Sequence, residues 1–222
     1  MSVEPVSIAL EDGETVSGLW QAPMDARAAY IFAHGAGAGM AHKSMSAIAD
    51  GLVSRGIAVL RYNFRYMERG SKRPDAPPLA HAAVRAAAVK AKALAPDLPL
   101  FAGGKSFGGR MTSQAQAIAP LPDVCGLLFF AFPLHPAGKP GDERAKHLAD
   151  VKLPMLFLQG TRDELAELSL LEPAVAKLKP RATLTLFEDA DHAFHVPAKT
   201  GRKDAAVLAD ILDAAAAWMA AY

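Results

Sequence analysis

The sequence is poor in cysteine and has no long hydrophobic run. Cys125 is the only cysteine among the 222 residues, which excludes an internal disulfide and a zinc site built from several cysteines. It lies in the apolar run VCGLLFFAF, so we expect a buried and inert thiol. No segment reaches the ~18 consecutive apolar residues of a membrane-spanning helix. The sequence therefore predicts a protein without a membrane span.

The sequence also lacks an excess of charge of either sign. It has 24 Lys and Arg residues against 23 Asp and Glu residues, a formal net charge of +1. This balance gives no long-range attraction to nucleic acid or to an anionic membrane. The N-terminal stretch has neither the positively charged start nor the long apolar core of a secretory leader. We therefore expect a cytoplasmic protein that binds neither nucleic acid nor membrane.

Length and composition predict one compact domain, residues 1–222. A chain of this length with 51% hydrophobic residues can bury one sizeable core. No internal repeat or low-complexity linker divides it, and the proline-rich stretch at 73–78 is too short to separate two domains. We therefore expect a single functional site, while the composition indicates no particular oligomeric state.

From residue 29 onward, short apolar runs recur without polar alternation: AYIFA, IAVLRY, LPLFAG, GLLFFAF, PMLFLQ and TLTLF. This pattern is typical of strands covered on both faces in a parallel sheet. Helical patterns lie between them, such as the apolar stripe from Leu165 to Leu178 and an alanine-rich segment near 82–95. Two earlier β-like runs flank Asp12-Gly13, a pair typical of a tight hairpin. We predict a three-layer α/β fold, with about eight mostly parallel strands and an N-terminal antiparallel hairpin.

The stretch LFAGGKSFGGR, residues 100–110, fits two motifs. Its GKS resembles the end of a phosphate-binding P-loop, whereas GKSFG matches GxSxG, the nucleophile elbow of serine hydrolases. A P-loop requires a glycine five residues before Gly104, and Pro99 occupies that position. An elbow requires a strand before the serine and a helix after it, which the runs 98–102 and 110–118 supply. Ser106 is therefore the candidate nucleophile, and a helix-capping serine is the alternative.

A serine hydroxyl becomes a good nucleophile when a histidine takes its proton and a carboxylate orients that histidine. In the chain order serine, acid, histidine, the acid and the base each follow a later strand. Asp163 ends the GTRD segment after PMLFLQ, and His192 ends the EDADH segment after TLTLF. The alternatives are a helix-capping role for Asp163, the neighbouring Glu164 as the acid, and His195 as the base.

These segments, with the opening hairpin and FAHGAGAG after the third predicted strand, resemble the α/β-hydrolase family over nearly the whole chain. The chain is most similar to the small lidless dienelactone-hydrolase-like group, which includes the testis-expressed hydrolase-like proteins and the third subunit of the nonspecific-lethal chromatin complex. The resemblance implies the fold and a triad without metal or cofactor, but no substrate. The family's GxxD spacing falls on Asp163, and its base follows a GAD-like turn, here DAD, which favours His192 over His195.

The resemblance also implies an oxyanion hole. The donors would be the backbone amides of Phe107 and Ala36, with Gly37 as a possible substitute. Preorganised N–H groups stabilise the negative charge that develops on the carbonyl oxygen, and one donor is typically worth ~2.7 to 4 kcal/mol. We expect His34 to be a structural hydrogen-bonding residue beneath this loop.

The segment 61–73 carries five basic residues against one acidic residue and follows the fourth predicted strand. It therefore lies at the same sheet edge as Ser106. It is either an ordinary solvated loop or a cationic rim that attracts carboxylate-bearing or phosphate-bearing substrates. The candidates for the rim of the site are Arg65, Lys105, His135 and His195.

The connection between the sixth and seventh predicted strands has about twenty residues and one short helix near 142–149. It is too short for a large lid, so we expect an open site for small acyl groups.

We predict a carboxylesterase-like or thioesterase-like serine hydrolase acting on small-molecule esters or thioesters. The alternative is an α/β-hydrolase scaffold that serves as a non-catalytic binding or complex subunit. A nucleotide-binding protein is disfavoured by Pro99.

Overall fold

The structure, a computed structural model, describes residues 2–222. Its strands are β1 (Glu4–Ala9), β2 (Thr15–Gln21), β3 (Ala28–Ala33), β4 (Ile57–Tyr62), β5 (Leu100–Lys105), β6 (Val124–Phe130), β7 (Met155–Gly160) and β8 (Ala182–Phe187). They form one sheet in the order β1-β2-β4-β3-β5-β6-β7-β8. The β1–β2 and β2–β4 pairs are antiparallel and the other pairs are parallel. This confirms the predicted sheet and its antiparallel N-terminal hairpin.

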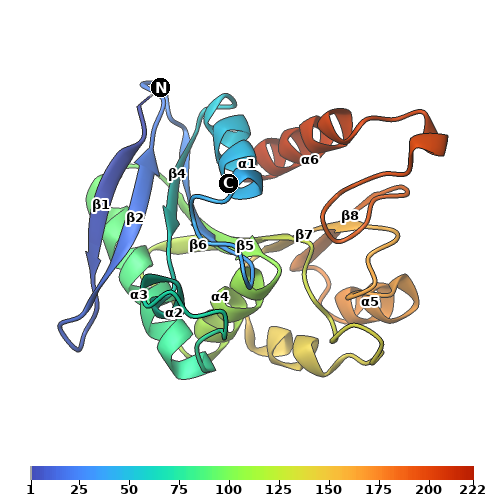
Figure 1. The fold of residues 1–222 in the computed structure, drawn as a ribbon, viewed down its shortest axis with the longest axis horizontal. Coiled ribbons are helices and arrows are strands. Elements are labelled where there is room, and N and C mark those ends of the chain that lie inside the picture. Colours follow the sequence, from blue (N-terminus) through green and yellow to red (C-terminus); the bar gives the residue numbers. More distant parts are fainter. Residues whose placement is uncertain (1) are drawn as a thin grey trace.

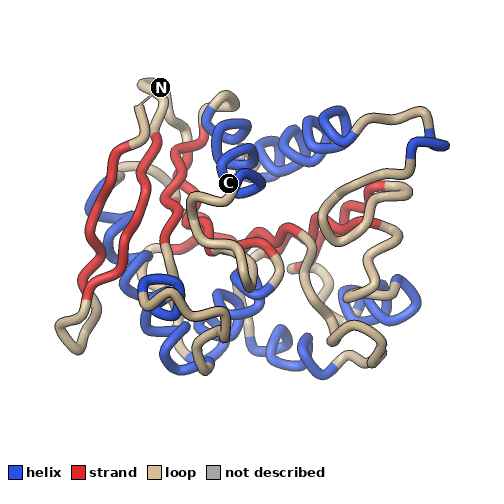
Figure 2. The backbone as a smooth tube through the Cα atoms, viewed as in Figure 1, coloured by secondary structure: helices blue, strands red, loops and turns tan. Residues whose placement is uncertain are grey.

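Helices connect the parallel strands and lie on both faces of the sheet (Figure 1, Figure 2). They are α1 (Lys43–Val53), α2 (Arg65–Glu68), α3 (Pro77–Leu94), α4 (Phe107–Ile118), α5 (Leu168–Ala176) and α6 (Asp204–Met219), with the 3-10 helices η1 (Glu143–Asp150) and η2 (Ala198–Thr200). Side chains of α1 and α6 pack in one core, and those of α3, α4 and α5 pack in another on the opposite face. The predicted three-layer arrangement is therefore confirmed.

The central strands β3 and β4 are buried along their whole length. Successive side chains of a strand point to opposite faces. On β3, Tyr30 and Phe32 accordingly enter the core under α1 and α6, while Ile31 and Ala33 enter the other core. Because both faces are covered, both sets of side chains are apolar, which explains the continuous apolar runs in the sequence.

Two helices begin at other positions than the sequence pattern predicts. α5 begins at Leu168 rather than at Leu165, because a carboxylate oxygen of Asp163 accepts the backbone N–H of Leu165 at 2.8 Å and holds a turn there. α4 begins at Phe107, so a single residue separates it from the end of β5. The turn between β5 and α4 is therefore tighter than the predicted boundaries indicate.

The carboxyl ends of the parallel strands bring separate loops to one edge of the sheet. Residues 34–37 follow β3, residue 106 follows β5, residues 161–163 follow β7 and residues 188–192 follow β8. Functional sites of open α/β sheets lie at this edge. The connection from β6 to β7 contains η1 as its only helix, so the expectation of no large lid is confirmed.

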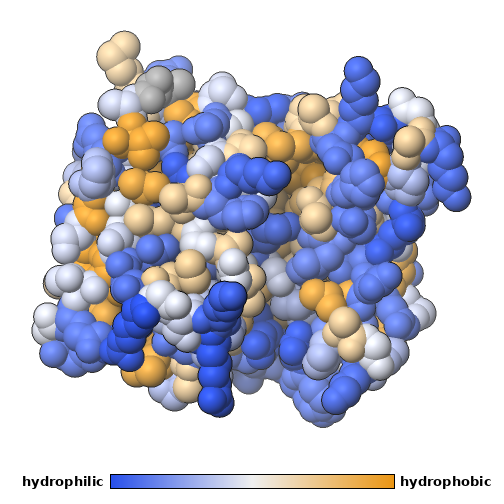
Figure 3. All heavy atoms as spheres, viewed as in Figure 1, coloured by the Kyte–Doolittle hydropathy of each residue, from blue (hydrophilic) through white to orange (hydrophobic). Residues whose placement is uncertain are grey.

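The outer surface and the single thiol complete the description. On the face drawn in Figure 3, hydrophilic residues predominate and hydrophobic residues lie in scattered patches. Within residues 2–222, none of the helices combines the length and apolar character needed to cross a bilayer. Cys125 is half-buried rather than fully buried, its thiol lies 3.1 Å from the carbonyl oxygen of Leu100, and burial raises the pKa of the thiol.

Candidate active site

Ser106 occupies a sharp turn between β5 and α4. Its backbone has φ 50° and ψ −116°, a conformation that is strained for a residue with a side chain. Ser106 stands at the N-cap position of α4, but its hydroxyl makes no capping hydrogen bond. A Cβ atom on either Gly104 or Gly108 would lie 2.4 Å from the carbonyl oxygen of Ala33. The turn therefore requires glycine two residues before and two residues after the serine.

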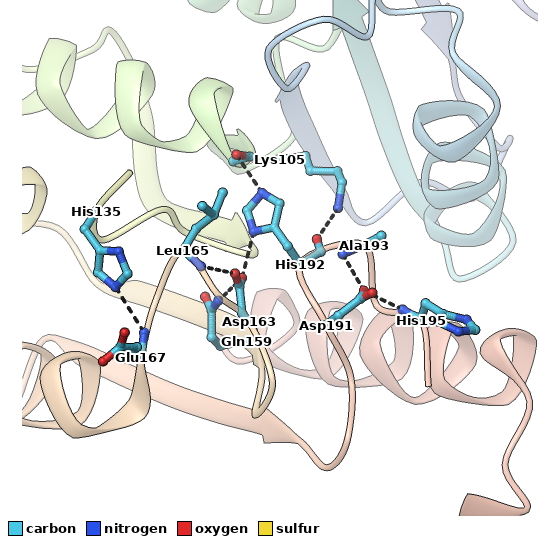
Figure 4. Close-up of polar contacts among 11 residues, drawn as sticks. Lys105, His135, Gln159, Asp163, Leu165, Glu167, Asp191, His192, Ala193 and His195 are labelled. Carbon is cyan, nitrogen blue, oxygen red and sulfur yellow. Dashed lines mark hydrogen bonds and ion pairs between the residues drawn. The ribbon is translucent and has the colours of Figure 1, made fainter. Parts of the chain in front are cut away.

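The side chain of His192 lies between this serine and Asp163, and Figure 4 shows the contact between His192 and Asp163. Ser106 Oγ is 2.8 Å from His192 Nε2, and His192 Nδ1 is 2.7 Å from Asp163 Oδ2. An ionised carboxylate is only an acceptor, so Nδ1 carries the proton and Nε2 is left to accept the serine hydroxyl. The structure thus brings together three residues from the ends of β5, β7 and β8, whereas Glu164 is exposed.

Asp163 is held by contacts that leave its carboxylate little freedom. Its side chain is fully buried, and it accepts hydrogen bonds from the Leu165 backbone and from the side-chain amide of Gln159. Gln159 is itself fully buried on β7. The sequence analysis missed Gln159, although it is the one polar residue in the run PMLFLQ. A polar residue at the end of an otherwise apolar strand, four residues before the acid, was the available signal.

The loop that carries His192 is built by local hydrogen bonds. The carboxylate of Asp191 accepts the backbone N–H groups of Ala193 at 2.7 Å and His195 at 2.9 Å. Asp189 has a positive φ, and its N–H donates to the Thr161 hydroxyl at 2.8 Å. Both aspartates are therefore turn residues, and these contacts fix where the loop places His192.

Lys105 contacts the same loop from the opposite side. Its ammonium donates to the backbone carbonyl of His192 at 2.9 Å and lies 5.0 Å from the ring centre of Phe194. Burial lowers the pKa of Lys105 to about 8. Residues 105 and 106 thus hold His192 at two points, its backbone carbonyl and its ring. Lys105, predicted at the rim of the site, is directed to this carbonyl.

The loop after β3 passes close to the nucleophile. A Cβ atom on Gly35 would lie 3.8 Å from the Cβ of Ser106. His34 is fully buried beneath this loop, where its Nδ1 donates to the Gly35 carbonyl at 2.8 Å and its Nε2 accepts the N–H of Phe64 at 3.1 Å. Burial lowers the pKa of His34 to about 4, so the ring is neutral at pH 7. His34 therefore supports the loop through both ring nitrogens.

Two of the three predicted oxyanion donors have unengaged amides. In residues 2–222, the backbone N–H groups of Ala36 and Phe107 donate to neither a backbone nor a side-chain acceptor. Phe107 is the first residue of α4, where helical N–H groups have no partner within the helix. The N–H of Gly37 instead donates to the Tyr66 hydroxyl at 3.4 Å. The N–H of Gly37 is thus engaged by Tyr66, unlike the N–H groups of Ala36 and Phe107.

The expectation that Arg65 supplies a free cation to the rim is corrected by its contacts. Its guanidinium is buried and pairs with Asp12 at 2.6 Å and Glu14 at 3.0 Å, both in the β1–β2 turn. Arg69 pairs with the same glutamate. Arg61 is buried, and its guanidinium donates hydrogen bonds to residues of β2, of α1 and of the loop before α1. The charges of segment 61–73 are thus largely neutralised or enclosed.

The two histidines proposed for the rim also have other partners (Figure 4). His135 is buried, with Nδ1 donating to the Pro136 carbonyl at 3.0 Å and Nε2 accepting the N–H of Glu167 at 3.4 Å. His195 points away from His192 and lies 2.9 Å from Asp204, which raises the pKa of the imidazole. Both ring nitrogens of His135 are thus occupied, and the Nδ1 of His195 is engaged by Asp204 of α6.

Comparison with known proteins identifies the family of this chain. The family model for the alpha/beta hydrolase domain matches residues 26–220. Among residues 2–222, no group of three or more His, Cys, Asp or Glu side chains is arranged to hold a metal ion.

Several solved structures share the fold. The chain is similar to a dienelactone hydrolase from Anabaena variabilis, with 20% identity, 100% of this chain and 98% of that chain covered, and a TM-score of 0.80. It is also similar to an α/β serine hydrolase without lid from Xanthomonas campestris, with 22% identity, coverage of 98% and 95%, and a TM-score of 0.75. An esterase domain from Rhodothermus marinus gives 17% identity, 98% coverage of both chains and a TM-score of 0.74. At these identities the likeness concerns the fold.

Proposed function

The chain belongs to the alpha/beta hydrolase domain family, and we propose that it is a serine hydrolase that cleaves carboxylic esters or thioesters. The observation that carries the proposal is the hydrogen-bonded line from Ser106 through His192 to the buried Asp163, placed on a strained turn at the carboxyl edge of the sheet. A helix cap requires neither the strain nor the line of three side chains.

In the proposed reaction, Ser106 Oγ attacks the acyl carbon while His192 Nε2 accepts the hydroxyl proton. The carbonyl oxygen becomes negatively charged and is stabilised by the N–H groups of Phe107 and Ala36. The imidazolium then gives the proton to the departing alcohol or thiol, which leaves an acyl ester on Ser106. A water molecule, deprotonated by His192, hydrolyses this ester and restores the serine. Asp163 keeps the histidine in the required tautomer throughout.

The proposed substrates are small acyl esters or thioesters. The connection from β6 to β7 is too short to enclose the site, and its helix η1 has only eight residues. An open site gives little apolar surface for a long acyl chain, so binding energy comes from groups close to the ester. The narrower resemblance to the testis-expressed and chromatin-complex proteins and the cytoplasmic location both stay predictions.

A fluorophosphonate probe tests the proposal directly, because it phosphonylates a serine only when a base activates it. We expect stoichiometric labelling of the wild-type protein and none of Ser106→Ala. Ser113→Ala is the matched control, since it removes another serine hydroxyl near a histidine, and it should label like the wild type. An unlabelled wild-type protein with intact circular dichroism would favour the alternative of a non-catalytic scaffold.

A further inference from the structure

Most arginines of this protein have partners, but two half-buried ones do not. Four arginines form ion pairs: Arg55, Arg65, Arg69 and Arg202. Four more donate hydrogen bonds to backbone or side-chain oxygens: Arg27, Arg61, Arg85 and Arg181. Within the described chain, the guanidinium groups of the remaining four form neither a hydrogen bond nor an ion pair. Two of these, Arg73 and Arg162, are exposed to water, whereas Arg110 and Arg144 are half-buried. The Nε of Arg110 is fully enclosed without a hydrogen bond.

Arg110 lies close to the proposed nucleophile along α4, and Arg144 lies on η1 beside Arg110. Arg110 is one turn into α4, and its backbone N–H donates to the carbonyl of Ser106 at 3.1 Å. Its guanidinium carbon lies 5.9 Å from the ring centre of Phe107, whose N–H is a proposed oxyanion donor. Arg144 belongs to η1, which packs against α4. Burial lowers the pKa of Arg110, and the charge of Arg144 lowers it further, so the two guanidinium groups repel each other.

The surroundings increase the positive potential at this corner. Arg110 is in the first turn of α4, where the helix dipole is positive. Glu143, the neighbour of Arg144 on η1, pairs with Lys146 at 2.6 Å. Burial, together with the nearby charge of Arg110, lowers the pKa of His147 of η1 to about 4. Two partly desolvated like charges without a counter-ion destabilise the free protein, and a bound anion would relieve that cost.

We propose that Arg110 and Arg144 bind an anionic group of the substrate, a carboxylate or a phosphate, on the side of Ser106 that faces η1. This rests on the proposed hydrolase function and names its substrate class as anionic esters or thioesters. The planar guanidinium presents N–H groups in a fork that fits two oxygens of one carboxylate or phosphate. Arg110 and Arg144 take the role of cationic rim that the sequence predicted for Arg65. Arg65 cannot fill it, because its charge is neutralised by Asp12 and Glu14.

The test compares two esters that differ in terminal charge, mono-4-nitrophenyl glutarate and 4-nitrophenyl valerate. We expect wild-type kcat/KM to favour the glutarate ester by roughly tenfold or more, as for hydrogen bonds to charged groups. Arg110→Gln and Arg144→Gln should each lower this preference severalfold, and Arg110→Lys should retain part of it. Arg73→Gln is the control, because it removes an exposed and unpaired arginine of segment 61–73, and it should keep the wild-type preference.

Competition separates the two anions and provides a second measurement. Glutarate and inorganic phosphate are added separately to the valerate assay, and the stronger competitive inhibitor identifies the preferred group. Inhibition should weaken in Arg144→Gln even if Arg110→Gln does not fold. A wild-type protein that hydrolyses both esters with equal kcat/KM and is inhibited by neither anion overturns this inference and leaves the hydrolase proposal intact. Hydrolysis of neither ester, with no fluorophosphonate labelling, counts instead against the hydrolase proposal.

Discussion

Two serine–histidine pairs in this molecule have the same separation and different surroundings. Ser106 Oγ lies 2.8 Å from His192 Nε2, and Ser113 Oγ lies 2.8 Å from His147 Nε2. The first pair joins the turn after β5 to the loop after β8. The second joins the interior of α4 to η1. Distance alone therefore does not identify a nucleophile.

The third group and the backbone distinguish the pairs. His192 has the Asp163 carboxylate on its other nitrogen, whereas within residues 2–222 His147 has no carboxylate hydrogen bond. The hydroxyl of Ser113 can donate its single proton to the Arg110 carbonyl at 3.0 Å, the usual contact of a helical serine, instead of to His147. We infer that orientation by Asp163 and the strained turn separate a reactive serine from a structural one, and the following predictions test that difference.

The largest expected effect is on turnover when each serine is replaced by alanine. Ser106→Ala should lower kcat by roughly 10⁴-fold or more, because no nucleophile remains. Ser113→Ala should change kcat by less than about threefold, since its hydroxyl takes no part in the proposed reaction. Steady-state kinetics with a 4-nitrophenyl ester measure both. Comparable losses in the two variants would contradict the distinction between the pairs.

Removing the charge of the third group should have the next largest effect. Asp163→Asn keeps the shape of the side chain but favours the wrong tautomer of His192, so we expect kcat to fall by roughly 10³-fold to 10⁴-fold with the fold retained. The exposed neighbour provides the control, and Glu164→Gln should leave kcat within twofold of the wild type. An Asp163→Asn variant with normal kcat would show that orientation by the carboxylate is not what separates the two pairs.

Acid should destabilise the protein through its buried neutral histidines. The pKa of His147 and of His34 is lowered from 6.5 to about 4 by burial. The unfolded chain therefore binds these protons at a higher pH than the native protein, and stability falls as the pH drops from about 6.5 toward 4. The full shift of His34 corresponds to about 3 kcal/mol, and that of the less buried His147 to less. Urea midpoints at pH 7 and pH 4.5 measure the loss, and His147→Gln should show a smaller one than the wild type.

The smallest expected effect is on stability at neutral pH. Ser113→Ala leaves the half-buried His147 Nε2 without its partner, so we expect the free energy of unfolding to fall by about 1 kcal/mol. Urea denaturation at pH 7 measures this change. A fall above about 3 kcal/mol would indicate that the pair has a larger role than one hydrogen bond.

The fold and the three residues of the proposed triad could be predicted because they depend on chain order. Continuous apolar runs predict buried parallel strands, and the residues that follow those strands must meet at one edge. Chain order indicates where the acid and the base lie, and the resemblance to the family favours Asp163 over Glu164 and His192 over His195. The start of α5 could not be predicted, because the hydrogen bond from Leu165 to Asp163 replaces a helical turn that the apolar stripe alone would favour.

The rim was predicted less well, because pairing across the chain decides which charges remain free. Arg65 is about fifty residues from Asp12 and Glu14, and no local pattern indicates that α2 packs beside the hairpin turn. Arg110 was visible as a basic residue near the elbow, but only the structure shows that it and Arg144 lack partners. His135 likewise looks available in sequence, while both of its ring nitrogens are occupied in the fold.

The position of β8 has a consequence for heat resistance. β8 is one of the two edge strands, pairs only with β7 and buries few of its side chains. Such peripheral segments open locally at lower free energy than the interior of a sheet. Since His192 follows β8, fraying of this strand would displace the proposed proton acceptor while the seven other strands stay paired. If the proposed function holds, we expect warming to reduce the activity reversibly at a temperature below that of global unfolding.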